Sequence, residues 1–171
     1  MVLGCTASAG AVEKTMGNST ATMALAIDNL PTRSGPSTAY RETGTYKVKG
    51  QQIRLLSYAY DDGGVCWVQC EVPYGGALRR VYTGLKRFDA ATVDLSTLPA
   101  EDPLTFARVR VLATSKALYG PGPEYGPYGK LTVDKGQKVS IVATDGEYAL
   151  VEWTTTKQSY RAWVTLDTLD N

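Results

Sequence analysis

The sequence predicts an all-β protein made of two small β-barrels in tandem, joined by a short linker. Short runs rich in β-branched and aromatic residues alternate with turns rich in Gly, Pro and Asp, which is typical of a small barrel or sandwich. Blocks of the first half return in the same order in the second half. The chain has 171 residues and 43% hydrophobic content, which is enough for compact cores.

Local composition predicts the first elements. Residues 1–21 are small and polar and show no period, so we expect a flexible tether there. Residues 23–27 are apolar and predict a short strand. The stretch RSGPSTAY at 33–40 predicts a stiff polar loop, because Gly and Pro interrupt regular structure and Ser and Thr bond to nearby backbone. Residues 52–60 have a period of two and predict a long strand with apolar residues on both faces.

Two more strands and a helical turn complete the first half. Residues 67–72 and 78–82 are strand-like, and the segments before them, 61–64 and 73–76, are turn-like. Residues 83–88 predict a helical turn. This spacing of short strands and turns favours a small barrel or sandwich.

The middle of the chain predicts a boundary between two domains. Residues 91–104 lack strand alternation and contain Pro99 and Pro103, so we expect a linker. A β pattern restarts at residue 105. The predicted organisation is a tether at 1–21, a first domain at 22–90, the linker at 91–104 and a second domain at 105–171.

The repeat consists of four matched blocks. The loop block GPSTAY at 35–40 matches GPGPEY at 120–125. The other matches are GQQIRLL (50–56) with GQKVSIV (136–142), WVQCEV (67–72) with YALVEW (148–153), and RVYTGLKRF (80–88) with RAWVTLDTL (161–169). The order is kept and the gaps fall in turns, which indicates a duplicated unit. A unit of about 60 residues is marginally stable alone, so docked barrels are expected.

Composition excludes several classes of function. Net charge is +1, and a nucleic-acid-binding protein would show a basic excess or a basic stripe. The pairs Arg79-Arg80 and Lys86-Arg87 are interpreted as solvated charges at strand ends. The chain has no histidine, which removes the commonest general base and metal ligand. We therefore expect no metal, no cofactor and no enzyme.

The three cysteines fall into two groups. Cys66 and Cys70 lie on one predicted strand, where four residues span about 13 Å, too far for a disulfide. We interpret both as small buried hydrophobes, with a redox pair as the alternative. Cys5 ends VLGC, which resembles the end of a bacterial lipoprotein signal whose Cys is lipidated. The charged start and apolar stretch of such a signal are missing upstream, so Cys5 marks either a processing remnant or a chance match. No run approaches the roughly 20 apolar residues of a transmembrane helix.

The motif around the predicted loop resembles bacterial SH3 (SH3b) domains. The resemblance covers residues 22–90 and 105–170. In the first copy it is carried by Leu30, Arg33-Ser34-Gly35-Pro36-Ser37, Tyr40, Gly44-Thr45, Gly50, Ile53, Trp67 and Tyr82. The second copy lacks the Arg-Ser pair, so the two copies need not bind the same ligand.

The resemblance implies SH3-like barrels and a non-catalytic binding module. Bacterial SH3 domains commonly accompany cell-wall hydrolases and envelope proteins, where they bind peptidoglycan peptides or cross-bridges. This implies an extracellular or cell-envelope protein, with a possible lipid anchor at Cys5. The alternative is a protein–protein interaction adaptor, or the targeting part of a larger exported protein. An enzyme that uses carboxylates is a third hypothesis, but no motif places an acid pair.

The resemblance also indicates where a ligand would bind, in a groove lined by aromatic side chains. For Trp67 and Tyr148, binding and packing are both open, whereas Tyr82 and Trp163 are expected to close the cores. The tyrosine-rich loop at 119–129 could bind ligand, cover its own barrel or dock the two copies. The candidate ligand residues are Tyr40, Tyr58, Tyr60, Trp67, Tyr125 and Tyr148, and the loop motif is Arg33, Ser34, Gly35 and Pro36.

Overall fold

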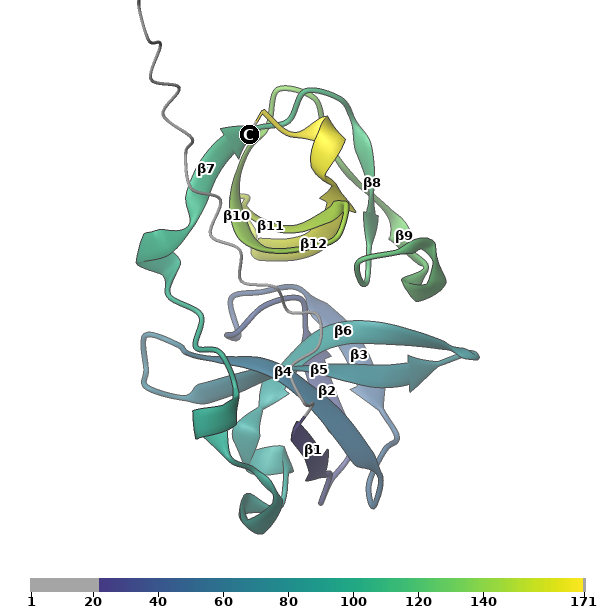
Figure 1. The fold of residues 1–171 in the computed structure, drawn as a ribbon, viewed down its shortest axis with the longest axis vertical. Coiled ribbons are helices and arrows are strands. Elements are labelled where there is room, and N and C mark those ends of the chain that lie inside the picture. The colour runs from purple at the N-terminus through teal and green to yellow at the C-terminus, as the bar shows by residue number, and fades with distance from the viewer. Residues whose placement is uncertain (1–21, 171) are drawn as a thin grey trace, which may run out of the picture.

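The computed structural model describes residues 22–170, so the predicted tether and Cys5 lie outside the described residues. Two six-stranded antiparallel sheets, one in each half of the chain, form the molecule (Figure 1). The all-β prediction is confirmed. Among the described residues, no helix has the length and apolar character needed to cross a membrane.

The sheet of the first half has the strand order β1-β4-β5-β6-β2-β3. A 3₁₀ turn, η1 (Leu85–Arg87), follows its last strand, where the sequence predicted a helical turn. The six strands are β1 (Thr22–Leu25), β2 (Leu30–Arg33), β3 (Glu42–Tyr46), β4 (Gln52–Tyr60), β5 (Cys66–Tyr74) and β6 (Ala77–Gly84).

The sheet of the second half has the equivalent order, β7-β10-β11-β12-β8-β9. The blocks that repeat in the sequence lie on corresponding strands, for example β4 with β10 and β5 with β11. The 3₁₀ turns of this half are η5 (Pro123–Tyr125) and η6 (Leu166–Thr168). Its strands are β7 (Ala107–Arg110), β8 (Ser115–Leu118), β9 (Pro127–Val133), β10 (Lys138–Asp145), β11 (Tyr148–Thr154) and β12 (Ser159–Thr165).

Strand β4 shows why the sequence placed apolar residues on both of its faces. Ile53 and Leu55 are buried in the main core, on the face that the period of two predicts. The register with β5 then shifts between Leu55 and Ser57. Next to this bulge Leu56 joins a second buried cluster with Leu150 and Trp163 of the other half. At Leu56 the second apolar face therefore packs against the second half instead of facing solvent.

The segment predicted to be a linker is folded against the first half, as its path beside β4 in Figure 1 shows. It forms three 3₁₀ turns, η2 (Ala90–Thr92), η3 (Leu95–Thr97) and η4 (Pro103–Thr105). The carboxylate of the residue before each turn accepts a hydrogen bond from the backbone within it. The residues between η3 and η4 pair with β4, because Tyr58 N donates to Pro99 O and Glu101 N donates to Tyr58 O.

Candidate functional site

The predicted ligand residue Tyr40 contacts the second half of the chain. Its hydroxyl donates to Glu152 Oε2 at 2.5 Å. Arg161 lies 5.5 Å from the centre of the Tyr40 ring, and its Nε donates to the same Glu152 oxygen at 2.7 Å. Burial raises the pKa of the Tyr40 hydroxyl well above its usual value. Tyr40 therefore remains a neutral donor to the carboxylate at neutral pH.

The predicted ligand residue Tyr125 makes the reciprocal contact with the first half. Its hydroxyl donates to Glu71 Oε2 at 2.5 Å, and Arg80 Nε donates to that oxygen at 3.1 Å. Burial raises the pKa of Tyr125 to about 12. Burial alone would also raise the pKa of Glu71, but the Tyr125 hydrogen bond and the Arg80 charge outweigh it and lower that pKa. By the sequence repeat, these three residues correspond to Tyr40, Glu152 and Arg161.

The GP-x-x-x-Y pattern has a steric reason in both copies. A Cβ atom on Gly35 would lie 2.2 Å from the Tyr40 ring, and one on Gly120 would lie 2.1 Å from the Tyr125 ring. Glycine is therefore needed for each tyrosine to fold back over its own loop. The motif predicted as a ligand loop thus shapes the loop that reaches the other half.

The remaining loop-motif residues hold this shape. Arg33 donates to Tyr40 O at 2.7 Å and to Glu42 at 2.9 Å. The Ser34 hydroxyl accepts from Arg161 N at 3.4 Å, and Pro36 is buried. Ser34 therefore contributes directly to the junction between the halves.

Arg161 links side chains of both halves at the junction. It is 3% exposed, and its Nη1 donates to Glu101 Oε2 at 2.5 Å and to the Tyr82 hydroxyl at 2.8 Å. Glu101 also accepts from Ser57 at 2.6 Å and from Tyr82 at 2.8 Å. Glu101 belongs to the segment predicted as a linker, so that segment supplies one of the two acids that neutralise Arg161.

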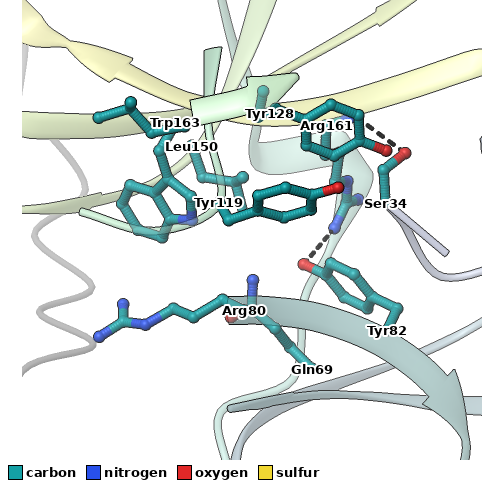
Figure 2. A pocket seen from close by; sticks show the side chains of 11 residues that line it. Ser34, Gln69, Arg80, Tyr82, Tyr119, Tyr128, Leu150, Arg161 and Trp163 are labelled. Atoms are coloured by element: carbon teal, nitrogen blue, oxygen red, sulfur yellow. Dashed lines mark hydrogen bonds between the residues drawn. The ribbon is translucent and has the colours of Figure 1, made fainter. Parts of the chain in front are cut away.

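A small polar cavity lies between the two sheets beside Arg80 and Arg161 (Figure 2). It measures about 10 Å³, which is room for one water molecule. Three buried polar atoms of its lining residues, Gln69 Oε1, Tyr128 Oη and Trp163 Nε1, have no hydrogen-bond partner among the described residues. Trp163 and Tyr82 are almost fully buried, as their predicted role in closing the cores requires.

The tyrosine-rich loop of the second copy docks on the first half. Arg79 lies between two rings, 3.4 Å from the centre of Tyr74 and 4.0 Å from that of Tyr119. Tyr119 stacks on Tyr128 at 4.3 Å, and Arg41 of the first half lies 5.3 Å from the Tyr128 ring. These contacts match the docking alternative stated for the loop at 119–129. They depend on pairs that are distant in the sequence, so the sequence carried no signal for them.

The other predicted ligand residues are placed differently. Trp67 is 9% exposed and its Nε1 donates to Asp61 at 3.0 Å, which fixes it as a packed side chain. Tyr148 packs against the second buried cluster, which contains Leu56, Leu150 and Trp163. Tyr58 makes an edge contact with Tyr60 at 6.0 Å, and Tyr60 is 60% exposed. Tyr60 is therefore the candidate whose ring is most open to a ligand.

An apolar pocket of about 470 Å³ opens at the start of β5. Its wall includes Cys66, the residue opposite Tyr60 in the pairing of β4 with β5, and Lys86 of η1. The remaining lining residues are all apolar: Val65, Leu85, Phe88, Ala90, Val93 and Leu95.

The pocket exists because the segment after η1 folds back over the end of the β4–β5 hairpin. Ala90, Val93 and Leu95 come from this segment. The pocket could not be predicted from the sequence pattern, since residues 91–104 predict a linker without regular structure. The weak signal was the spacing of Val93, Leu95 and Leu98, the apolar residues of the otherwise polar run 92–98.

The two described cysteines are free thiols. Cys70 is fully buried, as interpreted, and burial raises the pKa of its thiol to about 12. Cys66 is half-buried instead, because it lies in the wall of the pocket. Burial also raises the pKa of Cys66, so its thiol is not activated. Among the residues that the structure describes, no group of three or more His, Cys, Asp or Glu could hold a metal ion.

No protein-family model matches the chain, and no curated protein matches it. The likeness to bacterial SH3 domains therefore rests on the sequence motif and remains a prediction.

Proposed function

We propose that the chain is a non-catalytic binding module of the bacterial cell envelope, in which two SH3-like barrels act as one body. Its ligand is a peptidoglycan peptide or cross-bridge. The observation that carries the proposal is the open apolar pocket, whose wall includes Cys66, the strand partner of the exposed Tyr60. A concave apolar site next to an exposed aromatic is typical of a site that anchors a flexible chain.

The SH3-like part of the proposal draws support from the order of the elements. Both sheets have the same strand order, and each has a loop after its second strand that carries the GP-x-x-x-Y pattern. Both also have a 3₁₀ turn directly after the sixth strand, η1 in the first half and η6 in the second. The cell-wall ligand itself is proposed from the sequence resemblance.

The non-catalytic part is supported by the state of the buried acids. Glu71, Glu101 and Glu152 each accept hydrogen bonds from an arginine and a tyrosine. These bonds hold the carboxylates in structural contacts at the junction, away from the apolar pocket. A general acid or base would need an acid that faces a ligand site.

The ligand site is proposed to lie on the first half. Tyr40 and Tyr125 both bond to carboxylates across the junction, so ligand binding through their hydroxyls would have to break those bonds. The exposed Tyr60, its neighbour Tyr58 and the adjoining pocket remain accessible. One chain would therefore present one principal site.

A protein–protein interaction adaptor is the second candidate. The nearly apolar wall of the pocket favours it, because such a wall suits the aliphatic or aromatic side chain of a protein partner. The same surface of the first half would serve both functions.

Co-sedimentation with insoluble bacterial cell wall at low and high salt tests the proposal. Wall binding that survives salt, is lost in Tyr60→Ala and persists in the matched variant Tyr74→Ala would support it, since Tyr74 is the exposed tyrosine of the other hairpin. Failure of the native chain to sediment would contradict a wall ligand. A single protein recovered from an extract in a Tyr60-dependent way would then favour the adaptor.

A further inference from the structure

We propose that the apolar pocket binds a small amphiphilic anion, with the apolar body of the ligand inside and its anionic group at Lys86. This inference rests on the proposed function, because it takes the chain to bind a ligand and not to catalyse a reaction. It goes beyond that function because it names the ligand chemistry and the residue that selects it.

The size and wall of the pocket suit a small apolar body. Its volume of about 470 Å³ falls in the usual range of small-molecule sites, roughly 300–1,000 Å³. Six of its lining residues are aliphatic or aromatic, and a half-buried thiol is the seventh. Such a wall offers almost no partner for a polar group inside the pocket, so polar ligands are disfavoured there.

Lys86 supplies the charge that selects an anion. It is the one charged residue in the wall, and none of the ion pairs within residues 22–170 involves it. The neighbouring Arg87 is paired with Asp28. Lys86 is exposed, so its stem covers the edge of the apolar wall and its ammonium group stays in water beside that edge. The anionic group of the ligand is therefore expected at this edge.

The second half lacks the features that build this site. In the sequence repeat Lys86 corresponds to Asp167, which reverses the charge. The lining residues Ala90, Val93 and Leu95 come from the segment after η1, which lies outside the matched blocks of the repeat. At this position of the repeat, the cation that would select an anion is therefore present in the first half and replaced by an acid in the second.

Two fluorescent probes separate the apolar requirement from the charge requirement. 8-Anilinonaphthalene-1-sulfonate and N-phenyl-1-naphthylamine share the same aromatic body, and the first also carries a sulfonate. The native chain should bind the sulfonated probe more tightly, with one site per chain. Lys86→Met should weaken the sulfonated probe by about two- to fivefold and leave the neutral probe unchanged. Lys86→Arg should keep the preference, and Lys157→Met, at an exposed lysine of the β11–β12 turn, should change neither affinity.

A second variant tests the location without removing a core side chain. Ala90 is exposed and lines the pocket, so Ala90→Phe should fill it and weaken both probes. An unchanged thermal midpoint would show that this variant is folded. Ligand should also slow alkylation of Cys66 in a Cys5→Ser background, because the thiol lies in the wall.

Equal affinity of the native chain for both probes, or no effect of Lys86→Met or of Ala90→Phe, would overturn the inference. The wall assay is independent of these probes. Wall binding without selective probe binding would refute the anion site alone, whereas selective probe binding without wall binding would refute the wall ligand alone.

Discussion

Replacing Arg161 by methionine is expected to destabilise the folded chain severely. The arginine side chain is 2% exposed and lies between two acids, Glu101 at 2.5 Å and Glu152 at 2.7 Å. Methionine has a similar length and keeps most of the packing, but it supplies no charge and no donor. The change therefore leaves two carboxylates near each other without the cation that they share.

The magnitude follows from the burial of Glu101. Its side chain is 7% exposed, so solvent cannot replace the lost arginine. Removing one partner of a buried ion pair typically costs about 3–5 kcal/mol, because the other charge stays buried without compensation. The hydrogen bonds from Ser57 and Tyr82 to Glu101 remain and place the loss toward the lower end of that range.

Urea unfolding followed by tryptophan fluorescence measures the loss of unfolding free energy. The matched control is Arg87→Met, which breaks the pair with the half-exposed Asp28 and should cost no more than about 1 kcal/mol. Adding Glu101→Gln to Arg161→Met should recover part of the loss, since the double variant no longer buries that unpaired charge. If Arg161→Met costs as little as Arg87→Met, or if the two changes are simply additive, the buried network does not stabilise the junction as argued.

Three further predictions concern the same junction. As pH falls, the stability that Glu71 supplies should begin to decline below the ordinary glutamate pKa of about 4.3, and it should be lost below the lowered pKa of Glu71 in the folded chain. Urea midpoints measured across this pH range check this. Glu71→Gln should remove that part of the pH dependence. Gly35→Ala should lower stability by about 1–3 kcal/mol in thermal unfolding through its clash with Tyr40, whereas Gly84→Ala, whose nearest contact is at 3.9 Å, should be tolerated. A high-resolution crystal structure should show a water bonded to Gln69 Oε1 and Trp163 Nε1, and its absence from a well-ordered map would contradict this assignment.

Strand positions could be predicted because they depend on local pattern. The predicted strand at 52–60 coincides with β4 (Gln52–Tyr60), and the repeat correctly related it to β10. The linker could not be predicted to fold, because its 3₁₀ turns are single turns capped by Asp89, Asp94 and Asp102 and have no periodic apolar face. Its structure depends on packing against β4, which the sequence does not encode locally.

The sequence pattern could predict which types of residue form the candidate site, but not which partners each of these residues contacts. The sequence identified aromatic residues as candidates for the site, but it could not separate Tyr40 from Tyr60. Both are tyrosines near a loop, and they differ in whether a carboxylate from a distant strand lies within reach. That distinction requires the relative placement of the two halves, which no single-copy motif contains.

The division between shared and unshared features indicates where selectivity should be sought. Features that repeat in both copies, such as the loop tyrosine with its Glu and Arg partners, are used reciprocally in the junction. Because these side chains already form hydrogen bonds with one another across the junction, few of their donors and acceptors remain free to bind a ligand. Features that differ between copies, such as Lys86 against Asp167 and the segment after η1, meet instead at the open pocket. A ligand that distinguishes the two halves must interact with residues that differ between them. In this chain, such residues lie at the open pocket of the first half.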